Sequence, residues 1–141
     1  MPRRAPFRGG PVLLTDERWA DLREVNRIVN RDIVAEPNEL GLAAETWLIN
    51  PRYGDCNDYA VSKRHELLKR GWPARTLLLA EAVTESAEHH LVVVVRTKTG
   101  DLVLDNLTPQ IRHWSRTPYR WVRIQMPHNP RHWASVAGDR A

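Results

Sequence analysis

The one cysteine of this 141-residue chain, Cys56, stands where a protein places a reactive thiol. Asp55 and Asp58 flank it in the pattern of a capping box, and helix-forming residues continue to Arg70, before Gly71. Cys56 is therefore predicted in the first turn of a helix of about 15 residues. The unpaired N–H groups and the positive dipole end of such a turn lower a thiol pKa, and the Cys56 N–H is a donor for an oxyanion. The alternative for a lone cysteine is a small buried hydrophobe.

Two apolar runs downstream predict a pair of antiparallel strands. Residues 90–95 and 102–107 are apolar and rich in strand-forming side chains, and the polar connection 97–100 between them ends in glycine. If this connection is a hairpin loop, Arg96 lies opposite Asp101 and fixes the register of the whole pair.

That register brings a histidine and an aspartate together. His90 and Asp105 face the same side of the sheet as diagonal neighbours, roughly 7–8 Å apart at the backbone. A carboxylate in an apolar strand is costly unless it is paired. We therefore expect His90 to be the base for Cys56, with a sulfur-to-ring distance of about 4 Å, and Asp105 to orient it. The rival histidine, His89, faces away from Asp105.

Further elements are expected around these residues. Apolar residues at steps of three and four predict a helix near 16–34, and a second, short helix is expected at 43–49. Strands are expected near 75–83 and 119–125, which makes a sheet of about four strands. Two side chains upstream of the cysteine, Asn50 and the indole of Trp47, are candidates for the second oxyanion donor, with a structural role as the alternative for each.

Three blocks of sequence resemble the signature of the bacterial transglutaminase-like cysteine proteinases. They are Gly54-Asp55-Cys56-Asn57-Asp58-Tyr59-Ala60, Glu88-His89-His90-Leu91-Val92 and Leu102-Val103-Leu104-Asp105-Asn106-Leu107. The resemblance covers about residues 19–125 and implies an α+β, papain-like fold with a Cys-His-Asp triad at Cys56, His90 and Asp105. The family histidine immediately precedes the apolar pair, which again selects His90 over His89.

The resemblance also raises calcium. Family members that cut surface adhesins in the periplasm bind calcium through acids of the cysteine block. Here Asp55 and Asp58 match, but Asn57 stands where the pattern has glutamate, and fewer carboxylates weaken calcium binding. We expect the two acids to serve as helix caps, with a calcium site at Asp55 and Asp58 as the alternative; no other cofactor is required by the sequence.

Length and composition place the chain among single-domain proteins. We divide it into an extended basic tail at 1–14, a peptidase domain at 15–126 and a C-terminal extension at 127–141. No run of about 18 apolar residues predicts a membrane span. The chain as it stands reads as cytoplasmic, or as periplasmic if an N-terminal signal segment is missing.

The leading interpretation is a cysteine peptidase acting on a protein or peptide through an acyl-enzyme. The same triad serves a transglutaminase-type acyl transferase, in which an amine replaces water, and the fold also suits a non-catalytic peptide-binding module. Arginines alternate with Trp114, Tyr119 and Trp121, a composition that binds nucleic acid. For that stretch we favour an ordinary half-exposed edge strand.

Overall fold

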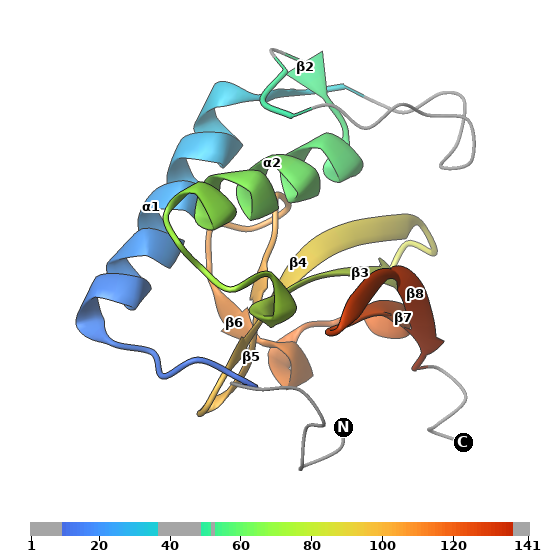
Figure 1. The fold of residues 1–141 in the computed structure, drawn as a ribbon. Coiled ribbons are helices and arrows are strands. Elements are labelled where there is room, and N and C mark those ends of the chain that lie inside the picture. The colour runs from blue at the N-terminus through green and yellow to red at the C-terminus, as the bar shows by residue number, and fades with distance from the viewer. Residues whose placement is uncertain (1–9, 37–48, 52, 137–141) are drawn as a thin grey trace.

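The protein is α+β, with two helices on one face of an antiparallel sheet (Figure 1). The computed structural model describes residues 10–36, 49–51 and 53–136. The helices are α1 (Asp16–Asp32) and α2 (Cys56–Lys69). Short 3-10 helices occur at Ala74–Thr76, after α2, and at Trp114–Arg116, between two strands. The helical and strand content confirms the expected fold class.

Helix α1 begins and packs as its sequence predicts. The Thr15 hydroxyl accepts a hydrogen bond from the Arg18 N–H at 3.2 Å, and acidic residues fill the first turn. One stripe is buried against the sheet, formed by Leu22, Val25, Asn26 and Val29. The helix ends at Asp32, slightly before the expected boundary, because the next residues form β1 (Val34–Ala35), which pairs in parallel with β2 (Tyr53–Gly54).

The main sheet has six strands in the order β6-β5-β4-β3-β7-β8. The strands are β3 (Leu77–Val83), β4 (His89–Thr97), β5 (Gly100–Leu104), β6 (Arg112–His113), β7 (Arg120–Met126) and β8 (Asn129–Ser135). Strand β4 lies at the centre and is buried from His90 onward, as its run of valines predicts.

The expectation of about four strands was too low by the two outermost ones. Strand β6 has only two residues, which leaves no alternation to detect in the sequence. Strand β8 contains Pro130, which argues against a central strand but is tolerated at an edge. The stretch for which an edge strand was favoured divides between two strands: β6 lies at an edge of the sheet, whereas β7 does not, because β8 pairs with it.

Strand β5 ends earlier than expected, and the cause lies at Asp105. The predicted run was 102–107, whereas the strand stops at Leu104. The Asp105 carbonyl accepts hydrogen bonds from two helices, and its carboxylate accepts the Leu107 N–H at 3.0 Å. These bonds replace the ladder and turn the chain away from the sheet.

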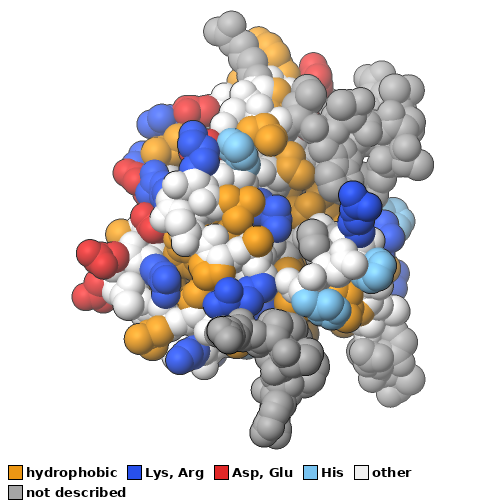
Figure 2. Space-filling view, viewed as in Figure 1, with side chains coloured by type: hydrophobic (Ala, Val, Ile, Leu, Met, Phe, Trp, Pro, Cys, Tyr) orange, Lys and Arg blue, Asp and Glu red, His pale blue; other side chains and the backbone are white. Residues whose placement is uncertain are grey.

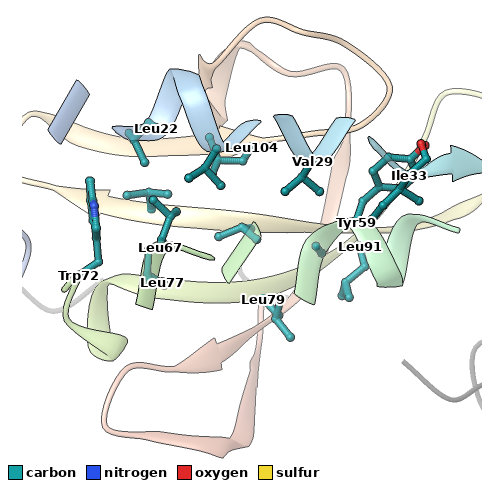
Figure 3. Packing of buried hydrophobic residues seen from close by; sticks show 14 of the residues in the cluster. Leu22, Val29, Ile33, Tyr59, Leu67, Trp72, Leu77, Leu79, Leu91 and Leu104 are labelled. Carbon is teal, nitrogen blue, oxygen red and sulfur yellow. The ribbon is translucent and has the colours of Figure 1, made fainter. Parts of the chain in front are cut away.

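Helix α2 lies along β4 in the same direction, over the larger of two apolar clusters. Figure 3 shows Tyr59 and Leu91, from the first part of each element, at one end of this cluster. Leu67 and Trp72 lie at the other end, beside Leu77. The start of α2 and the start of β4 therefore lie toward the same end of the molecule (Figure 1).

The N-terminal segment packs on the sheet where it is described, rather than extending as a plain tail. Val12 is buried, and its backbone forms hydrogen bonds with Arg96 O of β4 and with the Lys98 N–H of the following turn.

The expected helix at 43–49 lies, apart from its last residue, outside the described residues. No helix in the described ranges is long and apolar enough to cross a bilayer. On the face shown in Figure 2, basic side chains are interspersed with other residues, and acidic ones gather mostly along the side of α1.

Candidate active site

Cys56 is the first residue of α2, as predicted, and the capping box in front of it is complete. Asp55 Oδ1 accepts the N–H groups of Asn57 at 3.0 Å and of Asp58 at 3.4 Å. In return Asp58 Oδ2 accepts the Asp55 N–H at 3.2 Å. Cys56 thus sits between two carboxylates whose oxygens are bonded to backbone donors, at the positive end of the helix dipole.

Gly54 makes this box possible. A Cβ added at Gly54 would lie 2.7 Å from both Cβ and Oδ2 of Asp58, closer than side-chain atoms approach one another. Only a glycine lets Asp58 reach back to the Asp55 N–H. The Gly-Asp-Cys sequence is therefore a backbone requirement of the helix start as well as a pattern.

The thiol is partly buried and lies beside an amide. Cys56 Sγ is 3.7 Å from Asn57 Oδ1, a distance suited to a weak S–H···O bond. Asn57 is fully buried, and its Nδ2 has no hydrogen-bond partner in the described structure. Asn57 therefore places a neutral acceptor next to the sulfur, where a carboxylate would raise the thiol pKa.

His90 and Asp105 form a buried pair, which confirms the register inferred from the sequence. Arg96 lies opposite Asp101 as predicted. His90 Nε2 is 2.8 Å from Asp105 Oδ1, and both side chains are almost fully buried. Because the carboxylate engages Nε2, Nδ1 is the ring nitrogen that remains for proton transfer with a thiol.

Tyr119 contacts both residues of the His90–Asp105 pair. It was not among the site residues expected from the sequence. Its hydroxyl donates to Asp105 Oδ2 at 2.5 Å, and its ring meets the His90 ring edge-on, with centroids 5.4 Å apart. Tyr119 precedes β7, so only the pairing of β7 with β3 brings it here. In the sequence its one signal was a place among alternating aromatic and basic residues.

The environment of Asp105 keeps it ionised. Burial alone would raise the pKa of this carboxyl, but hydrogen bonds from His90, Tyr119 and the Leu107 N–H hold the pKa below its usual value. The pKa of Tyr119 is raised by burial and by the adjacent carboxylate, so its hydroxyl stays a donor. A buried, ionised aspartate bonded to an imidazole can hold that ring in one tautomer and stabilise it when protonated.

His89 points elsewhere, as the register predicted. Its Nδ1 is 2.7 Å from Glu81 Oε2, and its side chain is 61% exposed. Glu81 also accepts a hydrogen bond from Arg123 Nε at 2.7 Å, which links β4, β3 and β7. His89 is therefore an exposed partner of a structural ion pair.

Helix packing places Cys56 and His90 at the same end of the fold. Helix α2 packs on β4, and both residues belong to the first positions of their elements. A distance of about 4 Å between the Cys56 sulfur and the His90 ring stays a prediction.

The two proposed oxyanion donors fare differently. The Asn50 N–H donates to Ser62 Oγ at 2.5 Å, and its Nδ2 donates to Glu66 Oε2 at 2.9 Å. Glu66 lies ten residues after Cys56, about 15 Å along the helix axis. Asn50 thus contacts the middle of α2 and does not serve as an oxyanion donor beside the thiol. Trp47 lies outside the described residues.

The acids beside Cys56 are engaged with the backbone of the helix start. No group of three or more His, Cys, Asp or Glu side chains able to hold a metal occurs in the part of the chain that is described. Calcium takes six to eight oxygen ligands, whereas Asp55 and Asp58 supply carboxylates that already cap α2. Both acids therefore act as helix caps, the role expected from the sequence, and a calcium ion beside them would need further oxygen ligands.

Comparison with known proteins agrees with this fold. The family model described as bacterial transglutaminase-like cysteine proteinase matches residues 6–141. Calcium-bound LapG of Legionella pneumophila has 21% identity and a TM-score of 0.71, over 84% of this chain and 68% of LapG. Two further structures of Legionella pneumophila LapG, the second of them EGTA-treated, have 24% and 23% identity and TM-scores of 0.64 and 0.63. Each covers 75% of this chain, which spans 64% and 62% of those two LapG chains, or just under two thirds. No protein of curated function matches.

Proposed function

The chain belongs to the bacterial transglutaminase-like cysteine proteinases, and from this membership we propose that it cleaves peptide bonds through Cys56, His90 and Asp105. The observation that carries the proposal is the buried His90–Asp105 pair, at the end of the fold where α2 begins with Cys56. The nucleophile sits at a helix N-terminus and the base is oriented by an ionised acid, as covalent hydrolysis requires.

In the proposed reaction Cys56 is the nucleophile and His90 acts in turn as base and as acid. His90 takes the proton of Cys56, and the thiolate sulfur attacks the substrate carbonyl carbon. The negative oxygen that forms is stabilised by the positive end of α2, where the Cys56 N–H is the donor we propose. The protonated His90 then gives its proton to the leaving amine, and a thioester remains. Water, deprotonated by His90, attacks the thioester carbon and releases the acid product and the thiol.

The protein substrate is tested by comparing an active and an inactive enzyme. Wild type and Cys56→Ala are each incubated with a bacterial proteome, and newly formed peptide N-termini are labelled and identified by mass spectrometry. We expect a set of termini that appears with wild type alone, because the chain has no other thiol. The same termini with Cys56→Ala would overturn the proposal.

Calcium is not part of this mechanism, although one LapG structure is calcium-bound. We propose that Asp55 and Asp58 act as caps and that Asn57 takes the place of a third charged ligand. The melting temperature is therefore expected to be the same in millimolar calcium and in EGTA, since a ligand that binds only the folded state would raise it. A calcium-dependent rise that Asp58→Asn removes would show that these acids bind the metal.

A further inference from the structure

Two charged side chains of the described structure are buried to 1% exposure, Asp105 and Lys63, and the proposed reaction does not use the lysine. Lys63 is 1% exposed and lies in the middle of α2. Its Nζ donates to the backbone carbonyl of Asp105 at 2.9 Å and lies 5.9 Å from the Tyr59 ring centroid. Burial lowers the Lys63 pKa to about 7, and the Asp105 carboxylate opposes this shift. A buried ammonium is costly, so its retention calls for a role.

The same carbonyl receives a second donor. Asn30 Nδ2, from α1, donates to Asp105 O at 3.0 Å. Strand β5 has ended one residue earlier, so neither bond belongs to the ladder of the sheet. Two helices thus hold the main chain of one residue, the residue whose carboxylate faces His90 at 2.8 Å.

Helix α2 therefore carries both the nucleophile and a donor to the acid. Cys56 and Lys63 are seven residues apart, which is about two turns and places them on one face of the helix, about 10.5 Å apart along the axis. Because one rigid helix carries Cys56 and also contacts the Asp105 main chain through Lys63, it fixes the position of Asp105 relative to the sulfur. The bond from Asp105 then fixes His90. A displacement of about 1 Å in such an arrangement costs on the order of 10²-fold in rate.

We propose that Lys63 is a positioning residue of the active site, which with Asn30 holds the main chain of Asp105 so that its carboxylate orients His90 toward Cys56. This inference rests on the proposed function. Packing alone does not call for an ammonium, because methionine has a similar length and fills a buried site without a charge. The titratable and charged side chains that face the Asp105 carboxylate are His90, Tyr119 and Arg112.

The experiment measures the ionisation of the Cys56 thiol. Alkylation by iodoacetamide is followed from acidic to alkaline pH, and every event reports Cys56 because the chain has no other cysteine. An oriented imidazole keeps part of the thiol ionised at mildly acidic pH. We expect Lys63→Met to slow alkylation at pH 6 by about tenfold, as one unit of thiol pKa implies, and to match wild type at alkaline pH. Asn30→Ala should shift the curve in the same direction.

The controls separate the two levels of the proposal. Lys69→Met changes an exposed lysine of the same helix and should leave the curve unchanged. A wild-type curve identical to that of His90→Ala would refute the proposed triad itself. A wild-type curve that differs from His90→Ala but coincides with Lys63→Met and Asn30→Ala would refute the positioning role alone. If Lys63→Met fails to fold, Asn30→Ala, at a partly exposed position, decides by the same comparison.

Discussion

Replacing His90 with alanine is expected to lower the rate of peptide cleavage by on the order of 10⁴-fold, whereas replacing the adjacent His89 leaves it nearly unchanged. His90 is buried against Asp105, where it can take the thiol proton and later protonate the leaving amine. His89 is exposed and pairs with Glu81, which keeps its bond to Arg123 when His89 is removed. Cleavage of a substrate peptide found in the proteome comparison is the measurement.

Comparing the rates of His89→Ala and His90→Ala helps to separate a loss of catalysis from a loss of stability. Both variants change one histidine of β4, so unfolding of the strand would lower activity in each. Melting temperatures measured alongside the rates show whether His90→Ala stays folded at the assay temperature. Loss of activity in His89→Ala with retention in His90→Ala would contradict the assignment of the base.

The sequence predicted two parts of the candidate site, the helix start at Cys56 and the His90–Asp105 pair, better than the sheet, because both depend on local signals. The capping box places Cys56 by spacing alone, and the hairpin register places His90 against Asp105 because side chains alternate strictly along a strand. Neither inference needs the tertiary structure.

What the sequence could not show depends on long-range contacts. Tyr119 reaches Asp105 only because β7 pairs with β3, and Lys63 reaches it only because α2 packs along β4. In the sequence Lys63 is one lysine among helix formers, and nothing marks it as buried. The same holds for the end of β5, where side chains from two helices take the place of the ladder.

The acid that orients the base should prove nearly as important as the base. Asp105→Asn is expected to lower the rate by on the order of 10²–10⁴-fold, because an amide can present its oxygen or its nitrogen to His90 Nε2 and so loses control of the tautomer. The amide also cannot stabilise the protonated ring by charge.

Tyr119→Phe is the matched variant for this change, because it removes one hydrogen bond to the same carboxylate and leaves the charge in place. Its loss of rate should be much smaller. The pKa of Asp105 lies below its usual value, so the carboxylate stays ionised as the pH falls from neutral to mildly acidic. The fall in rate at the acid side of the pH profile should therefore report titration of the Cys56–His90 pair. The same fall is expected in Tyr119→Phe. A rate for Asp105→Asn equal to that of wild type across this range would show that His90 is oriented by another group.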